Sequence, residues 1–262
     1  MSPKFINIDG SLDFLVSPDT GSELEMGNGC LMGGQEEFPI FGKVPLLFPR
    51  AILQRAGKQK LICSDDKNDA LMQYLNMTLI KMYHGASNEP AESKWFQLHL
   101  SRSKEFFKEI QGTVLDIGCD NPKQSLGMFS NSNVEYLGID PLFSETSIFK
   151  IIGLAEFLPI KDASFDNVCF NTSLDHVFDY FTALVEARRV LKTKGKLLIS
   201  TLIWHENHQL YHDHHHFHHF KEFEIFGALK SLSFGVKRVE RFGWKNNAHR
   251  EAFYIEVEKL DD

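Results

Sequence analysis

From Thr113 to the end of the chain, segments with the spacing of β-strands alternate with segments that have the spacing of amphipathic helices. This alternation predicts an α/β fold in which a doubly wound, mostly parallel sheet carries helices on both faces. The last two strands are joined by only a short loop, so we expect that edge to be antiparallel. Helices are predicted over 177–191 and 220–232. The seven predicted strands cover 113–117, 134–139, 149–154, 167–171, 195–201, 236–242 and 252–257.

The preceding residues have a different character. Residues 1–50 consist of short apolar pieces broken by turn formers, and Gly27-Asn28-Gly29 predicts a hairpin between two short strands. We therefore expect a small β-rich module. Apolar spacing over 70–77 and 95–107 predicts helices in a linker or cap region. The predicted domains are 1–50, 51–110 and 111–262.

Composition excludes several classes of protein. The 262 residues are 43% hydrophobic and 24% charged, which argues against disorder. No apolar run approaches the ~20 residues of a membrane span, and the N-terminus lacks the layout of a signal peptide, so we expect a cytoplasmic protein. The cysteines are too dispersed for a disulfide framework or a complete zinc site. They are Cys30, Cys63, Cys119 and Cys169.

The most specific motif is the strand and turn at 114–120, Val-Leu-Asp-Ile-Gly-Cys-Asp. Ligands of open parallel sheets bind at the carboxyl ends of the strands, and Gly118 would let a ligand approach the backbone closely. Asp140 follows Asp116 by 24 residues, at the end of the second strand. A carboxylate there can accept hydrogen bonds from both hydroxyls of a ribose. The pair predicts a cofactor that contains adenosine.

The residues after Gly118 discriminate between such cofactors. A dinucleotide site needs further glycines, which bring the pyrophosphate to the helix N-terminus, and none follows within the next five positions. Asp120 would also repel a pyrophosphate. S-adenosylmethionine has no phosphate and carries two positive groups, so the sequence favours S-adenosylmethionine over NAD.

Roughly residues 110–258 resemble class I S-adenosylmethionine-dependent methyltransferases of the group related to small-molecule methyltransferases. The resemblance implies a Rossmann-like sheet. The matching segments are 114–120, 136–141, 155–159, 164–166, 173–177, 186–192 and 195–199.

The same resemblance implies roles for individual residues. Asp116 and Gly118 would hold the methionine end of the cofactor and Asp140 its ribose. Ala155 and Glu156 would border the adenine, although Glu156 is equally explained as a cap on a turn. Asn171 and Thr172 would form the floor of the site. The expected cofactor-binding residues are Asp116, Gly118, Cys119, Asp120, Asp140, Pro141, Ala155, Glu156, Asn171 and Thr172. For Cys119, simple packing is the favoured interpretation.

Two positions depart from the family pattern. Asp120 replaces the second glycine at a turn that often needs a positive φ, which aspartate tolerates better than most residues. Leu154 stands where many relatives place an aspartate for the adenine amino group. These changes would either weaken cofactor binding or reshape the pocket.

Residues 1–50 resemble, more weakly, a zinc-ribbon-like module of the kind that precedes certain methyltransferases. Ser17 and Thr20 occupy the expected cysteine positions and only Cys30 remains. A structural zinc ion needs four ligands, so we expect a degenerate module that has lost its metal.

Eight of the twelve histidines lie between His205 and His219. If helical, the pairs His212/His216 and His215/His219 would have the i,i+4 spacing of metal ligands. No carboxylate stands at a decisive offset, so we predict a polar segment and no metal site. In this fold the connection after the fifth strand often overhangs the acceptor, so a side chain there could remove a proton. The substrate candidates are His176, Tyr211, His214 and His216, and no catalytic base is assigned.

We expect methyl transfer to a small-molecule acceptor, such as a sugar or lipid precursor. The net charge of −7 disfavours nucleic acid, and the basic residues around 188–196 are explained as a solvated helix end. One alternative is an rRNA base methyltransferase that contacts RNA through Arg50, Arg55, Lys58 and Lys60. The other is a non-catalytic protein that only binds the cofactor. The oligomeric state does not follow from the sequence.

Overall fold

The computed structural model describes residues 4–41, 44–59, 94–120, 128–129, 133–142, 149–205, 216–244 and 247–261. The predicted helix over 70–77 lies outside this part of the chain. No described helix combines the length and the apolar composition needed to cross a membrane.

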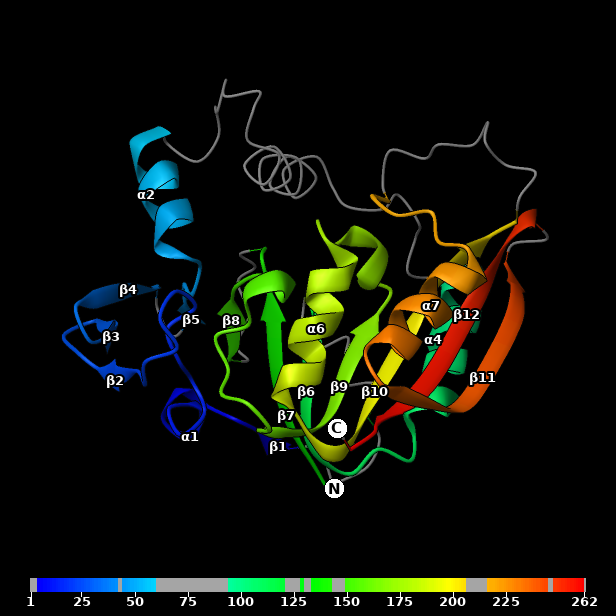
Figure 1. The fold of residues 1–262 in the computed structure, drawn as a ribbon, viewed down its shortest axis with the longest axis horizontal. Coiled ribbons are helices and arrows are strands. Elements are labelled where there is room, and N and C mark those ends of the chain that lie inside the picture. Colours follow the sequence, from blue (N-terminus) through cyan, green and yellow to red (C-terminus); the bar gives the residue numbers. More distant parts are fainter. Residues whose placement is uncertain are drawn as a thin grey trace.

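An eight-stranded sheet forms the centre of the molecule, and its order is β1-β7-β6-β9-β10-β12-β11, with β8 also paired to β7 (Figure 1). All pairings are parallel except those of β12, which runs antiparallel to both β10 and β11. The doubly wound, mostly parallel sheet is thus confirmed, with β1 added beside the seven predicted strands. The strands are β1 (Lys4–Phe5), β6 (Gly112–Ile117), β7 (Val134–Asp140), β8 (Lys150–Ile152), β9 (Phe165–Asn171), β10 (Leu191–Trp204), β11 (Phe234–Trp244) and β12 (Asn247–Lys259).

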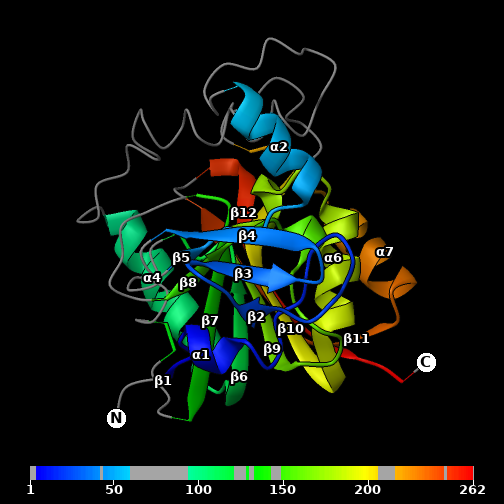
Figure 2. The same ribbon diagram turned by 90° about the vertical axis from the view of Figure 1, so that its left-hand side faces the viewer.

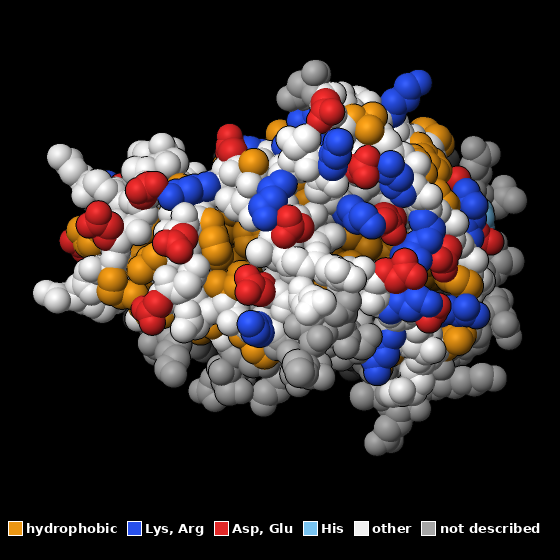
Figure 3. Space-filling model, turned by 90° about the horizontal axis from the view of Figure 1, so that it is seen from below, with side chains coloured by type: hydrophobic (Ala, Val, Ile, Leu, Met, Phe, Trp, Pro, Cys, Tyr) orange, Lys and Arg blue, Asp and Glu red, His pale blue; other side chains and the backbone are white. Residues whose placement is uncertain are grey.

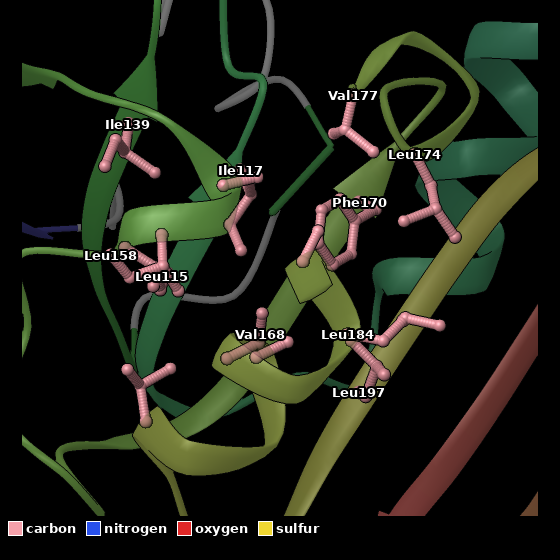
Figure 4. Close-up of a cluster of buried hydrophobic side chains, with 14 of the residues drawn as sticks. Leu115, Ile117, Ile139, Leu158, Val168, Phe170, Leu174, Val177, Leu184 and Leu197 are labelled. Carbon is pink, nitrogen blue, oxygen red and sulfur yellow. The ribbon is translucent and has the colours of Figure 1, made fainter. Parts of the chain in front are cut away.

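Helices cover both faces of this sheet. In Figure 1, α6 (Tyr180–Val190) and α7 (Glu222–Ser231) lie in front of the strands and α4 (Lys94–Phe107) lies behind them. Because side chains alternate along a strand, the buried strand residues divide into two clusters. Leu115 packs in the cluster on the α6 side, and Val114 in the cluster on the α4 side. Figure 4 shows part of the first cluster, which contains Leu184 of α6 together with Val168, Phe170 and Leu197 from the strands.

The N-terminal residues form a separate four-stranded antiparallel sheet at one end of the molecule (Figure 2). It consists of β2 (Glu25–Met26), β3 (Cys30–Gly33), β4 (Glu36–Phe41) and β5 (Val44–Pro45), flanked by α1 (Ile8–Ser11) and α2 (Arg50–Gln59). The hairpin predicted at 27–29 is confirmed. Leu15, Leu31 and Phe38 belong to the same hydrophobic cluster as Leu115 of the central sheet. The small module therefore shares its core with the large one.

Hydroxyl groups stand at the two positions where the zinc-ribbon resemblance expects cysteines. Ser17 and Thr20 both donate hydrogen bonds to one carboxylate oxygen of Glu36, and the distance from Thr20 is 3.0 Å. Glu36 is buried. A buried carboxylate that accepts hydrogen bonds from two hydroxyl groups therefore joins this turn to β4.

Candidate functional site

The carboxyl ends of β6, β7, β8 and β9 meet at one edge of the parallel sheet, because neighbouring parallel strands run in the same direction. Four segments lie at this edge. They are the turn at 118–120, the end of β7 at Asp140, the short 3-10 helix η1 (Ala155–Phe157) and the turn at 171–173. The topology thus brings the predicted cofactor-binding residues to one edge.

The turn after β6 depends on two residues with positive φ. Gly118 has φ +79° and Asp120 has φ +41°, so aspartate adopts the left-handed conformation expected at the missing glycine. A Cβ atom on Gly118 would lie 2.3 Å from the Cβ of Ser173. The Ser173 hydroxyl in turn donates a hydrogen bond to the carbonyl of Ile117. Gly118 is therefore required by the close packing of this turn against the segment after β9.

Asp140 holds this turn and the loop after β7 in place. Its side chain is buried, and its two carboxylate oxygens accept hydrogen bonds from the N–H groups of Asp120 at 2.8 Å and Leu142 at 2.7 Å. Burial raises the pKa of Asp140, whereas Lys150 and these two N–H groups lower it. Each oxygen carries a second lone pair. The carboxylate thus retains acceptor capacity for the two hydroxyls of a ribose.

Lys150, the first residue of β8, was not predicted as a site residue. It is completely buried, and its ammonium donates to the carbonyl oxygens of Asp120 and Leu142 at 2.7 and 2.9 Å. These are the same two residues whose N–H groups bind Asp140. A lysine inside an apolar strand is a usable sequence signal, because lysine is almost never fully buried without a partner.

Asp116 and Cys119 are both buried beside this turn. The hydroxyl of Tyr136 donates to Asp116 at 2.7 Å. The Cys119 sulfur packs against Gly138, where an added Cβ would lie 2.6 Å from it. Burial, followed by the nearby Asp140 and Asp116, raises the pKa of the Cys119 thiol well above its usual range. Cys119 therefore has the environment of a packing residue rather than of a nucleophile.

Glu156 lies in η1 and is buried. Its Oε1 atom accepts hydrogen bonds from the N–H groups of Phe178 at 2.7 Å and Asp179 at 3.0 Å. Of the two interpretations left open by the sequence, these contacts support the cap. Leu154, just before η1, packs in an apolar cluster with Val44. Ala155 is buried, and Pro141 after β7 is partly exposed.

The end of β9 forms a side-chain hydrogen bond with the neighbouring strand β10. Asn171 accepts a hydrogen bond from the hydroxyl of Ser200 on β10 at 2.9 Å. Thr172 is exposed and has φ +56°, a conformation that β-branched residues rarely adopt. Its hydroxyl donates to the carbonyl of Asn171 at 2.7 Å. The strained turn leads directly into the second 3-10 helix, η2 (Leu174–His176).

Two of the predicted substrate residues lie together beyond this turn. The rings of His176 and His216 stack with centroids 4.7 Å apart, and both rings are near the buried Asp175. Tyr211 and His214 lie outside the described residues. The ring of Trp204, at the end of β10, contacts that of His216 edge to face. Trp204 also lines an open pocket of about 500 Å³. The residues that line this pocket are Trp204, His205, Lys221, Glu222, Phe223 and Phe226.

The basic residues at the end of α6 and the start of β10 bind other parts of the chain. Arg189 donates to the carbonyl oxygens of Leu158 and Ile160 at 2.9 and 2.6 Å. Arg188, Lys192 and Lys196 bind the Leu232 carbonyl, Asp166 and Glu256. On the face shown in Figure 3, Lys and Arg side chains also lie among Asp and Glu side chains. These contacts give the basic segment a structural role.

Comparison with known proteins gives matches to both sequence and fold. Residues 115–199 match the family described as a methyltransferase domain. An uncharacterized protein of Methanocaldococcus jannaschii is 25% identical over 181 residues, which cover 64% of this chain and 84% of that protein.

Two solved structures share the fold at 14% sequence identity. The 1,6-didemethyltoxoflavin-N1-methyltransferase of Burkholderia thailandensis, solved with 1,6-didemethyltoxoflavin and S-adenosylhomocysteine, has a TM-score of 0.58 and covers 92% of this chain and 100% of its own. The [4+2]-cyclase SpnF has a TM-score of 0.54 and covers 74% of this chain and 96% of its own. Since one neighbour is a methyltransferase and the other a cyclase, the fold by itself does not specify the reaction.

Proposed function

We propose that this chain is an S-adenosylmethionine-dependent methyltransferase that methylates a small molecule held beyond the carboxyl ends of β9 and β10. The match of residues 115–199 to a methyltransferase domain supports this proposal. The observation that carries the proposal is the buried Asp140 carboxylate. It is fixed by two backbone N–H groups and keeps acceptor capacity on both oxygens.

The side chains at this edge fit the charges of the cofactor. We propose that Asp140 accepts hydrogen bonds from the ribose hydroxyls. Asp116 and Asp120 would favour the positively charged methionine end through their negative charges. When bound, S-adenosylmethionine supplies an electrophilic methyl group. Gly118, Cys119, Pro141, Ala155, Asn171 and Thr172 would form the surrounding walls, and Glu156 would hold η1 against the start of α6.

For the acceptor, the pocket beside Trp204 combines aromatic walls with a lysine and a glutamate. This mixture suits a small molecule with both apolar and polar parts, and the acceptor named for the B. thailandensis neighbour is also a small molecule. The protein would hold the acceptor in line with the methyl group, because positioning supplies most of the catalysis in such a displacement. His176 and His216 are the described candidates for removing a proton from the acceptor.

Transfer of a labelled methyl group tests this proposal. Purified protein is incubated with methyl-labelled S-adenosylmethionine and, separately, with small-molecule and RNA fractions of cells that carry the gene. We expect the label in the small-molecule fraction only, and none with Asp140→Ala. Label in RNA would support the rRNA alternative instead. Cofactor binding without transfer to either fraction would indicate a non-catalytic binding protein.

A further inference from the structure

A carboxylate and two imidazoles converge at the start of the segment that follows β9. The Nε2 atom of His216 lies 3.6 Å from Oδ2 of Asp175, and the Nε2 atom of His176 lies 3.9 Å from its Oδ1. The candidate ligand atoms of these three residues all lie within 4.8 Å of one another. Both distances are too long for hydrogen bonds. Two ligands on one tetrahedral zinc ion, each bound at about 2.1 Å, are separated by about 3.4 Å, so the spacing suits a shared ion.

The Asp175 carboxylate gives a second, independent indication. The side chain is buried, and its Oδ1 atom has no hydrogen-bond partner among the described residues. A buried carboxylate oxygen without a partner is costly. A divalent cation bound to this oxygen would satisfy the carboxylate.

The backbone holds these groups in place. The carbonyl oxygen of Asp175 accepts hydrogen bonds from the N–H groups of Phe217 at 2.9 Å and His218 at 3.1 Å. One ring nitrogen of His218 lies 2.9 Å from the carbonyl oxygen of Val177, on the other side of η2. The residue that follows His216 is therefore fixed directly to the residue that supplies the carboxylate. Such fixation of the surrounding residues is what a preformed metal site requires.

We propose that Asp175, His176 and His216 bind one divalent transition-metal ion such as Zn²⁺. Two imidazoles and one carboxylate favour zinc or a neighbouring transition metal over Mg²⁺ and Ca²⁺, which prefer oxygen ligands. Three protein ligands leave at least one coordination position open, as in catalytic zinc sites. Sequence patterns do not predict this site, because Asp175 lies 41 residues before His216. This role is an alternative to proton removal by His176 and His216, because an imidazole nitrogen that ligates a metal ion cannot accept a proton. Ion binding can be measured without the cofactor, so the proposal does not depend on methyl transfer.

Metal titration tests the site. Chelator-treated protein is titrated with Zn²⁺ by calorimetry and with Co²⁺ by absorption spectroscopy. We expect one ion bound with micromolar affinity. We expect Asp175→Asn and His216→Gln each to weaken binding at least tenfold, and exposed Asp13→Asn, a matched control, to leave it unchanged. Melting temperatures of the metal-free variants show that each has folded.

Three results would overturn the proposal. The first is the absence of binding to the wild-type protein. The second is wild-type affinity in both Asp175→Asn and His216→Gln, which would place the ion on other histidines of the 205–219 segment. The third is a Co²⁺ spectrum with thiolate charge-transfer bands, which would place the ion on a cysteine.

Discussion

The Asp140 carboxylate and the Lys150 ammonium bind the backbone of the same two residues. Asp140 accepts from the N–H groups of Asp120 and Leu142, and Lys150 donates to the carbonyl oxygens of these residues. The left-handed turn at Asp120 and the loop after β7 are consequently held by charge-assisted hydrogen bonds, which are stronger than neutral ones. The site is organised by its own residues before any ligand enters it.

Gly118 offers a test at the level of one residue. Gly118→Ala places a Cβ atom against Ser173 in a backbone conformation that alanine disfavours. We expect it to lower the free energy of unfolding by at least about 2 kcal/mol. Gly227, in α7, has no atom within 4 Å of an added Cβ. The matched control Gly227→Ala should therefore stabilise the protein by about 0.5–1 kcal/mol. Urea unfolding measures both, and equal effects would contradict this account of the turn.

Local sequence patterns predict some of these residues and not others. Asp116, Gly118 and Asp140 stand at the ends of apolar strands, where the pattern itself marks a ligand-binding edge. Lys150 binds carbonyl groups that lie 8 and 30 residues earlier, and His216 lies 41 residues after Asp175, so no local pattern reveals these partners. The role of Glu156 likewise depends on N–H groups that lie 22 and 23 residues later.

At the scale of elements, the strands are predicted more accurately than their ends. Predicted strand 195–201 extends over Leu191–Trp204, because Leu191 pairs with Phe165 of β9 and antiparallel pairing with β12 continues to Trp204. Predicted helix 177–191 begins only at Tyr180. Asp179 caps its first N–H groups, and Glu156 binds the two N–H groups before them. These long-range contacts decide where the helix starts.

Glu156 makes this junction sensitive to pH. Burial raises its pKa above the ordinary 4.5, so the folded protein holds the proton more tightly than the unfolded chain does. Its stabilising contribution is therefore complete at low pH and is lost as the pH rises through the raised pKa. Glu156→Gln has no proton to lose, yet its amide oxygen still accepts both N–H bonds.

We therefore expect the free energy of unfolding of the wild type, minus that of Glu156→Gln, to fall between about pH 4.5 and about pH 7.5. Urea unfolding at both pH values measures this difference. Glu135→Gln, which removes an exposed carboxyl group from β7, corrects for the change in net charge. A difference that stays constant or grows with pH would show that Glu156 is not the buried acid inferred from its contacts.

At the scale of the whole molecule, residues 1–50 and the central sheet share one hydrophobic cluster, and β1 pairs with β7. The three tryptophans, Trp95, Trp204 and Trp244, all lie outside residues 1–50. Tryptophan fluorescence thus reports on the remainder of the chain. A mutation inside the small module then reveals whether the two parts unfold together.

Leu15→Ala should lower the unfolding midpoint seen by tryptophan fluorescence, with a loss of about 2–4 kcal/mol, because Leu15 is fully buried in the shared cluster. Half-exposed Met26→Ala, a control in the same module, should change stability by less than about 0.5 kcal/mol. An unchanged fluorescence midpoint in Leu15→Ala would mean that the small module folds independently.

The central claim is that Asp140 holds the ribose of S-adenosylmethionine, and calorimetric titration with S-adenosylhomocysteine tests it most directly. Two hydrogen bonds to a charged carboxylate contribute about 1.5–3 kcal/mol each. We predict micromolar binding to the wild type, at least about a hundredfold weaker binding to folded Asp140→Ala, and wild-type binding to exposed Asp13→Ala. Undiminished binding to Asp140→Ala, or none to the folded wild type, would contradict the account.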